Sequence, residues 1–296
     1  MWTRLVPLAA LLTLACLTVP DSAVHPTTIT LTKVDSAESV DFSDEVVWIL
    51  VLGSDARAGQ DVNSGNTDAI HLVGLDLPSH RAVDIGIPRD FYIDLPGTGP
   101  ERGLDRINTA LDAGGPDLAS QAVDDLMGIT PHYVFVVGFD GLRDMVGTVR
   151  GVTVFADQPV PDLDIRRGRN HLDGRETLAY ARTRDLTGDD FARSANQQQI
   201  MLGILRQVLA HEGETGFIED GVLAALQGLE TDLPPTELYR LGRAVTQIDP
   251  DLVTICVLTG DDFETESGDQ VLDPDEEAAQ RLGRDIRNDA QINGDC

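Results

Sequence analysis

One apolar run near the start of the chain constrains the fold more than any other feature. Residues 45–53, EVVWILVLG, place seven apolar side chains in succession and end at Gly53. A short strand that is apolar on both of its faces is typical of a strand buried within a layered sheet. The run therefore predicts a buried strand, with a loop beginning just after Gly53.

Strand-like and helix-like patterns alternate along the rest of the chain. Further strand-like runs occupy residues 69–77, 82–90, 132–139, 152–156 and 252–258. Helical spacing of apolar residues occupies 114–128, 140–151, 171–184, 191–212, 234–248 and 273–289. Because strands that alternate with helices are typical of layered α/β proteins, the sequence predicts an α/β fold.

The charge balance excludes one class of partner. The chain has 50 acidic and 22 basic residues, with a formal net charge of −28. Binding to nucleic acid requires a basic face, so we expect no nucleic-acid partner. The hydrophobic fraction of 42% is that of a globular protein, not a disordered one.

The first residues have the pattern of an export signal. Arg4 precedes an apolar stretch from Leu5 to Val19, which is short for a membrane span. We interpret residues 1–23 as a signal peptide, with a short membrane anchor and a lipid attached to Cys16 as alternatives. In an exported chain Cys256 and Cys296 are expected to form a disulfide, the alternative being two free thiols.

Charged residues gather where three predicted strands begin or end. Asp55 and Arg57 follow the first strand, Asp68 precedes the second, and the pair Arg89–Asp90 follows the third. Ligands of open α/β sheets bind at such an edge. Carboxylates there suit Mg²⁺ and arginines suit phosphate, although ordinary surface ion pairs would give the same residue types.

A second arginine cluster lies around the longest predicted helix. Arg182 and Arg184 precede it, and Arg193 and Gln197 share one of its faces because they are four residues apart. Anions bind well at a helix amino end, so the cluster suits a phosphate ligand. A structural network with Asp185, Asp189 and Asp190 explains the arginines equally well.

These motifs, in this order, resemble the LytR-CpsA-Psr family over roughly residues 46–210. The similarity rests on VLGSDAR, NTDAIHLVGLDL, VDIGIPRDFYIDLPG, RINTAL, HLDGRETLAYARTRD and DDFARSANQQQIM. The resemblance implies a three-layer α-β-α sandwich with a central mixed sheet. It also implies an extracytoplasmic, Mg²⁺-dependent phosphotransferase that moves a glycopolymer from polyprenyl pyrophosphate to the cell wall, in most cases to peptidoglycan.

The resemblance also assigns roles to individual residues. It implies catalytic roles for Asp55, Arg89, Asp90 and Arg193, phosphate contacts for Arg57, Arg106, Arg182, Arg184 and Gln197, and Mg²⁺ binding by Asp55 and Asp68. Asp55 and Asp90 are alternative proton acceptors. Arg106 stands where the family usually has lysine, and Asn196 where it usually has a second arginine, so the contacts at these positions differ from the family pattern.

The expected organisation follows from these assignments. Residues 24–44 form a linker that could hold a strand at 28–34, residues 45–212 the catalytic domain, and residues 213–296 an α/β extension packed on the same sheet. Apolar residues of 132–146 and 200–209 are candidate walls of a lipid cleft, or ordinary core. Two other functions fit the same residues: a hydrolase acting on the lipid-linked glycan, and a non-catalytic binder of lipid or glycan at the cell surface.

Overall fold

A computed structural model describes residues 27–37, 42, 45–96, 103–183, 189–211, 214, 229–294 and 296. The predicted signal peptide and Cys16 lie outside these residues, as does Arg184. In the part of the chain that is described, no helix is both long and apolar enough to cross a membrane.

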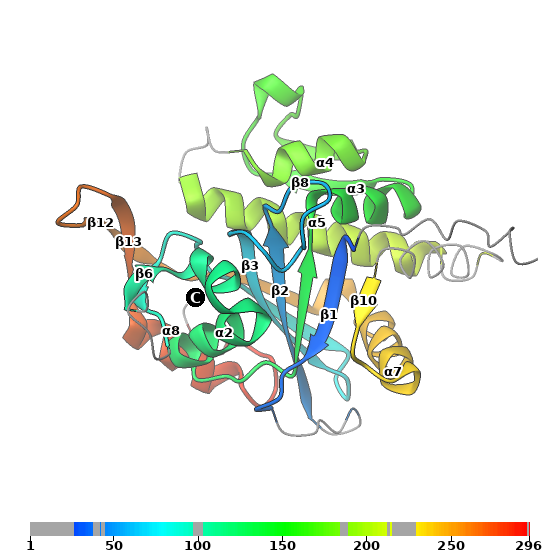
Figure 1. Ribbon diagram of the computed structural model, residues 1–296. Coiled ribbons are helices and arrows are strands. Elements are labelled where there is room, and N and C mark those ends of the chain that lie inside the picture. Colours follow the sequence, from blue (N-terminus) through cyan, green and yellow to red (C-terminus); the bar gives the residue numbers. More distant parts are fainter. Residues whose placement is uncertain are drawn as a thin grey trace, which may run out of the picture.

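A seven-stranded mixed sheet forms the centre of the molecule (Figure 1). Its strands lie in the order β10-β1-β7-β2-β3-β4-β11. The pairs β1–β10, β2–β7 and β4–β11 are parallel, and the other three neighbouring pairs are antiparallel. The bounds are β1 Ile29–Lys33, β2 Val46–Ser54, β3 Thr67–Asp76, β4 Arg81–Gly86, β7 Tyr133–Val137, β10 Leu229–Thr231 and β11 Val253–Val257.

Helices cover both faces of this sheet (Figure 1). On one face α2 (Ala110–Met127) and α8 (Glu276–Ile286) pack on alternate side chains of β2, including Trp48 and Leu50. On the other face α5 (Asp189–His211) and α7 (Pro235–Thr246) cover the intervening side chains, including Val47 and Ile49. The alternation along a strand thus supplies two separate cores. The predicted three-layer α-β-α sandwich with a central mixed sheet is confirmed.

A third, smaller core lies at one end of the sheet. It is built by α3 (Phe139–Thr148), α4 (Gly174–Ala181), part of α5, and a hairpin of β8 (Val152–Ala156) with β9 (Gly168–Leu172). Asp173 starts α4 with a capping box, because its carboxylate accepts from the backbone N–H of Glu176 while Glu176 accepts from the N–H of Asp173. The carboxyl end of α4 lies next to the start of β3, since the Gln197 amide donates to the backbone carbonyls of both Ala181 and Asp68.

The segment expected to be a linker contributes to the sheet. Within residues 24–44 the optional strand forms as β1, which pairs with β7 on one side and β10 on the other. Strands β10 and β11, from the expected C-terminal extension, also join this sheet. Two further hairpins lie outside it, β5 (Tyr92–Asp94) with β6 (Leu104–Arg106) and β12 (Gly260–Glu264) with β13 (Gln270–Pro274).

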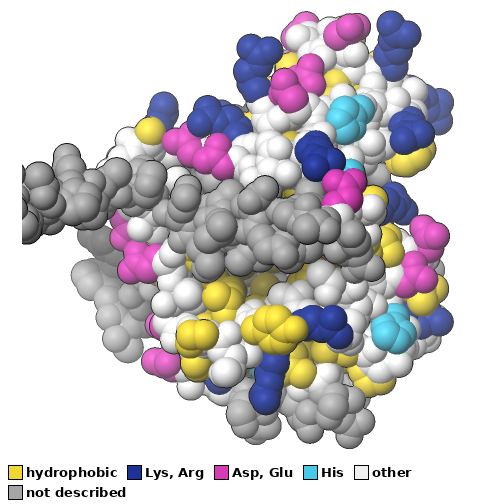
Figure 2. All heavy atoms as spheres, turned by 90° about the vertical axis from the view of Figure 1, so that its right-hand side faces the viewer, with side chains coloured by type: hydrophobic (Ala, Val, Ile, Leu, Met, Phe, Trp, Pro, Cys, Tyr) yellow, Lys and Arg dark blue, Asp and Glu magenta, His cyan; other side chains and the backbone are white. Residues whose placement is uncertain are grey.

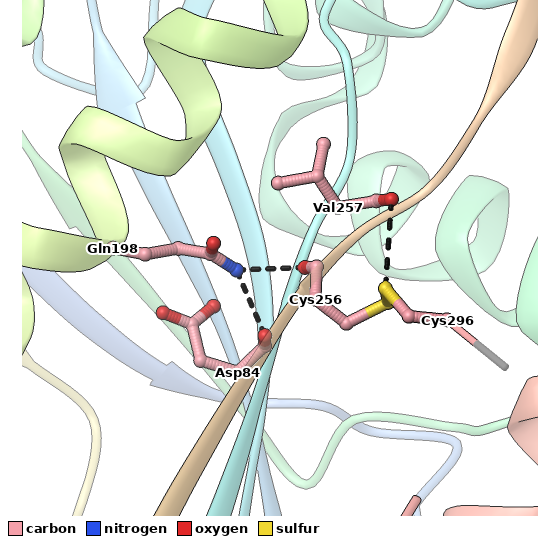
Figure 3. Close-up of a disulfide and its surroundings, with 5 residues drawn as sticks. All are labelled: Asp84, Gln198, Cys256, Val257 and Cys296. Atoms are coloured by element: carbon pink, nitrogen blue, oxygen red, sulfur yellow. Dashed lines mark hydrogen bonds between the residues drawn. A yellow bond between two sulfur atoms is a disulfide. The ribbon is translucent and has the colours of Figure 1, made fainter. Parts of the chain in front are cut away.

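A disulfide fixes the end of the chain to the edge of the sheet. Cys256 in β11 is linked to Cys296, as expected for an exported protein (Figure 3). Next to it Gln198 of α5 donates hydrogen bonds to the backbone carbonyls of Asp84 and Cys256, at 2.8 and 2.7 Å. This amide joins α5 to both β4 and β11.

Candidate active site

Four strand ends meet at one edge of the sheet. Gly53 near the end of β2 pairs with Ala69 near the start of β3 and with Val137 at the end of β7. His71 of β3 pairs with Gly86 at the end of β4. Asp55 and Arg89 in the loops after β2 and β4, Asp68 at the start of β3 and Phe139 after β7 are therefore brought to the same place, as the sequence predicted for the first three.

Five alternating charges form a chain at this edge. Asp68 Oδ1 lies 2.5 Å from Arg89 Nη1, and Asp68 Oδ2 lies 3.5 Å from Arg182 Nε. Asp90 continues the chain, with Oδ2 3.6 Å from Arg89 Nε and Oδ1 3.4 Å from Arg106 Nε. Three guanidinium groups against two carboxylates leave one excess positive charge, so the chain is an electrostatically suitable place for a phosphate.

The three arginines of the charged chain differ in how accessible they are to a ligand. Arg182 is half exposed and lies over the ring of Phe139, at 4.4 Å from its centroid. Arg89 is mostly buried, and its Nε atom has no hydrogen-bond partner. Arg106 donates to the backbone carbonyl of Gln270 in β13 at 2.9 Å. Arg182 is therefore the best placed of the three for a ligand, while Arg106 joins Asp90 to the β12–β13 hairpin.

Asp55 stands apart from these ion pairs. It lies in the loop after β2, where its backbone N–H donates to the carbonyl of Asn66 at 2.9 Å. A Cβ atom at Gly65, whose φ is +98°, would come within 2.7 Å of Asp55 Oδ1. Glycine is therefore required there both for the backbone conformation and for the space beside the carboxylate. Arg57 follows in the same loop and is exposed.

The predicted residues of α5 take structural partners. Arg193 is 4% exposed and pairs with Asp190 one turn earlier on α5. Gln197 is also buried, and its amide N donates to the backbone carbonyls of Asp68 and Ala181 at 2.9 and 3.1 Å. Asn196 accepts from Tyr180 Oη at 2.7 Å. The alternative of a structural network is therefore observed for Arg193–Asp190, while Gln197 does reach the backbone of a predicted site residue.

Two buried residues at this edge were not predicted from the sequence. His71 and Asp84 lie on β3 and β4, and His71 Nδ1 is 3.0 Å from Asp84 Oδ1. A signal was present in the sequence, because each is a polar residue within an otherwise apolar strand, AIHLVGL and AVDIGI. Polar groups in such places need a buried partner.

Two cavities adjoin the charged chain, and a third lies next to one of them. A polar cavity of about 250 Å³ lies between the loop after β2 and the start of α3, with Asp55, Arg57, Asp140 and Arg182 among its lining residues. An apolar cavity of about 80 Å³ begins at Asp68 and also contacts Arg182. A larger apolar cavity of about 380 Å³ lies between the sheet and helices α5 and α7.

These cavities are adjacent and share wall residues. Gly138, Phe139 and Arg182 line both the polar and the small apolar cavity. Val51 and Met201 line both the small and the large apolar cavity. Phe135, Leu202 and Leu205 also line the large one, so the two segments proposed as walls of a lipid cleft do supply wall residues. The arrangement suits a ligand with a charged group and a long apolar part.

Helix α7 closes the large cavity on the side away from the sheet. Leu238, Leu241 and Val245 line it. The helix is anchored through Glu237, which accepts from Tyr133 Oη at 2.7 Å and from Lys33 Nζ at 3.1 Å. Tyr239 and Val245 are exposed, and Figure 2 shows hydrophobic side chains gathered beside Lys and Arg side chains on this face. The wall of the cavity thus also offers an apolar surface to the outside.

Comparisons with known proteins agree with this arrangement. A sequence profile of the LytR_cpsA_psr family matches residues 19–288. The chain belongs to the LytR-CpsA-Psr family. The similarity inferred from motifs over residues 46–210 therefore extends over most of the chain.

Two curated relatives and one solved structure illustrate what the chain is similar to. The regulatory protein MsrR of Staphylococcus aureus is 30% identical over 207 residues, 68% of this chain and 60% of MsrR. The polyisoprenyl-teichoic acid–peptidoglycan teichoic acid transferase TagU of Bacillus cereus is 32% identical over 200 residues, 66% of this chain and 63% of TagU. The matched part thus spans less than two thirds of either relative.

The solved structure is that of YwtF (TagT) with bound octaprenyl pyrophosphate lipid. It is similar to this chain with a TM-score of 0.64 and 24% identity, covering 88% of this chain and 96% of TagT. This similarity confirms the fold. Through its similarity to TagU, the chain is related to a cell-wall transferase.

Proposed function

We propose that this LytR-CpsA-Psr protein transfers a glycopolymer from a polyprenyl-pyrophosphate carrier to a hydroxyl group of the cell wall, with peptidoglycan as the acceptor. One observation carries the proposal: a small apolar cavity is lined by Asp68 and Arg182 of the charged chain and lies next to a larger apolar cavity, with Val51 and Met201 in the walls of both. An apolar cavity that ends at arginines matches a ligand with a long lipid tail and a pyrophosphate head. TagT, a structural relative, has been solved with such a ligand, octaprenyl pyrophosphate.

The tail and the head of the carrier would bind by different forces. Isoprenyl carbons in the large cavity gain roughly 25 cal/mol per Å² of apolar surface removed from water. The pyrophosphate would meet Arg182 and Arg57, which are the more exposed arginines, and Arg89 beneath them. Guanidinium groups can bind phosphate oxygens with two parallel hydrogen bonds, so they also fix the orientation of the head.

The reaction we propose is a single phosphoryl transfer. The acceptor oxygen forms a bond to the sugar-linked phosphorus, the bond from that phosphorus to the bridging oxygen breaks, and polyprenyl phosphate leaves. A carboxylate takes the proton of the acceptor hydroxyl. Asp55 fits this role better than Asp90, because Asp55 lines the polar cavity while Asp90 is enclosed by two guanidinium groups. Such a reaction depends chiefly on positioning and charge neutralisation.

The carboxylates also fit a magnesium ion. Mg²⁺ is commonly held by one or two carboxylates together with substrate phosphates, and Asp55 and Asp68 provide two at one edge of the sheet. Among the described residues no three histidine, cysteine, aspartate or glutamate side chains gather as a complete metal site, so phosphate oxygens would have to complete the shell. When bound, the ion would neutralise charge on the phosphates.

We further propose that the protein acts outside the cytoplasm, next to the membrane. The Cys256–Cys296 disulfide supports export, because disulfides persist in oxidising compartments. The exposed apolar side chains of α7, beside Lys and Arg on the same face, suit contact with a membrane surface from which the lipid carrier would enter (Figure 2).

A transfer assay tests the proposal. The full chain is incubated with a polyprenyl-pyrophosphate-linked oligosaccharide, Mg²⁺ and a soluble peptidoglycan fragment, and the products are identified by mass spectrometry. We expect a phosphodiester-linked conjugate and polyprenyl monophosphate, both dependent on the acceptor. Equal release of phosphorylated glycan without the acceptor would instead show a hydrolase. Tight lipid binding without turnover would show a non-catalytic binder.

A further inference from the structure

Three buried polar side chains lie directly behind the Asp68–Arg182 pair. His71, Asp84 and Gln197 are 1%, 5% and 8% exposed, although the cavities around them are almost entirely apolar. Val73 pairs with Asp84 and His71 with Gly86 across β3 and β4, so His71 and Asp84 are diagonal neighbours on one face of the sheet. Figure 3 shows the Asp84 side chain on the side of β4 that faces α5.

The hydrogen bonds of this group define the orientation of every member. The amide N of Gln197 donates to two backbone carbonyls, those of Asp68 and Ala181. Its Oε1 atom lies 3.2 Å from His71 Nε2 and can only accept, so His71 Nε2 carries a proton. On the other side of the ring, His71 Nδ1 and Asp84 Oδ1 are 3.0 Å apart and share a proton. The His71–Asp84 pair is thus electrically neutral as a unit.

This orientation has a consequence for the charged chain. If the Gln197 amide were turned over, its NH₂ group would face the proton on His71 and its oxygen would face two carbonyls, so His71 and the two carbonyls favour the same orientation. In that orientation Gln197 connects the backbone of Asp68 to the backbone of Ala181, which directly precedes Arg182. The side chains of Asp68 and Arg182 form one of the ion pairs at the proposed pyrophosphate site.

We propose that His71, oriented by Asp84, is a positioning residue for phosphoryl transfer. Through Gln197 it sets the spacing between β3 and the carboxyl end of α4, and therefore the placement of Asp68 relative to Arg182. This inference rests on the proposed function. It also gives Gln197 a role different from direct phosphate contact, since both amide hydrogens and the amide oxygen already have partners within the protein.

The cost of burying charged groups supports a role beyond stability. Replacing a buried ion pair by apolar residues of similar volume is often neutral or stabilising, whereas removing one partner leaves an unpaired buried charge. Here both positions adjoin apolar cavities, and leucine has nearly the shape of aspartate and the volume of histidine, so it suits either position without filling the cavities. The pair is therefore expected to contribute to the geometry of the site more than to the free energy of unfolding.

The test is the double variant His71→Leu/Asp84→Leu, which avoids a single unpaired charge. We expect a melting temperature equal to or above that of the wild type, with kcat for transfer lowered about tenfold or more, as for lost outer-shell partners of other sites. The KM for the lipid-linked substrate should change less than kcat, because the tail cavity keeps its walls. Gln197→Glu, which keeps the acceptor for His71 but loses the bonds to both carbonyls, should lower kcat similarly.

Tyr180→Phe is the matched control. It removes another buried hydrogen bond between α4 and α5, from Tyr180 to Asn196, without touching the charged chain. We expect a small loss of stability and a kcat within about twofold of the wild type. A double variant with wild-type kcat, or an equal loss of kcat in Tyr180→Phe, would overturn the inference.

A second measurement keeps this inference separate from the proposed function. If the wild-type protein shows no transfer, the proposed function fails, and ¹⁵N NMR of the imidazole still tests the hydrogen-bond arrangement. We expect a proton on Nε2 of His71 and a proton shared between Nδ1 and Asp84. An unprotonated Nε2 would mean that the Gln197 amide is turned over, and would overturn the inference.

Discussion

Gly242 offers a direct way to occupy the cavity assigned to the lipid tail. It lies in α7 and lines the large apolar cavity. A Cβ atom built on it meets no heavy atom within 4 Å, so the space beside Gly242 is open for the side chain of Gly242→Leu. The substitution should therefore fill part of the cavity and leave the fold unchanged.

The size of both expected effects can be worked out. Replacing an interior helix glycine by leucine gains roughly 0.8–1 kcal/mol of helix propensity, and each kcal/mol raises the melting temperature of a chain of this size by about 2–4 °C. Four added carbon atoms exclude about as many carbons of the lipid, each worth about 0.8 kcal/mol. The loss of about 3 kcal/mol weakens lipid binding roughly 100-fold.

Thermal unfolding and titration with polyprenyl pyrophosphate measure these two effects on the same samples. Gly147→Leu is the matched control, since Gly147 is also an open, exposed glycine within a helix, α3, and lines none of the three cavities described above. It should raise the melting temperature similarly and leave the affinity unchanged. If Gly242→Leu is more stable but binds the lipid as tightly as the wild type, the tail lies elsewhere and the assignment of the cavity is refuted.

Three further predictions concern charge, pH and the disulfide. Arg89→Ala should lose a charge-assisted contact of about 1.5–3 kcal/mol and lower kcat/KM at least tenfold, whereas Arg143→Ala, at an exposed ion pair, should change it less than about threefold. The hydrogen bond from Tyr133 holds the pKa of the Glu237 carboxyl below its usual value, so the ionised carboxylate stabilises the fold above its ordinary pKa of about 4.3, and this stabilisation is lost as the pH falls through the lowered folded-state pKa. The difference in free energy of unfolding between the wild type and Glu237→Gln should therefore shrink as the pH falls. A difference that is independent of pH would contradict this. Cys296→Ser opens a loop with a sequence separation of 40 and should cost about 4 kcal/mol in denaturant unfolding, while an unchanged midpoint would show that the disulfide does not contribute.

Much of the fold could be predicted because its central elements have strong periodic patterns. The apolar run of β2 and the long apolar stripe of α5 each have one obvious interpretation. The β12–β13 hairpin could not be predicted, since the sequence GDDFE is polar on both faces and carries no alternation. Nothing local indicated that β1 pairs between β7 and β10, because pairing between distant strands depends on the whole topology.

The candidate site was predictable in its residue types more than in its contacts. Motif order brought Asp68, Arg89 and Arg182 together correctly. The pairing of Arg193 with Asp190 and the saturation of the Gln197 amide depend on side-chain packing, which a sequence pattern does not specify. The cavities could not be predicted from the sequence either, because a gap between α5, α7 and the sheet arises from how helices pack and not from any residue type.

The most direct test of the central claim is a crystal structure of the protein soaked with a polyprenyl pyrophosphate and Mg²⁺. We predict that the pyrophosphate lies within hydrogen-bond distance of Arg89 and Arg182, and that the tail passes Val51 and Met201 into the cavity between α5 and α7. A lipid bound with its tail outside this cavity, or with its phosphates away from both arginines, would contradict the account.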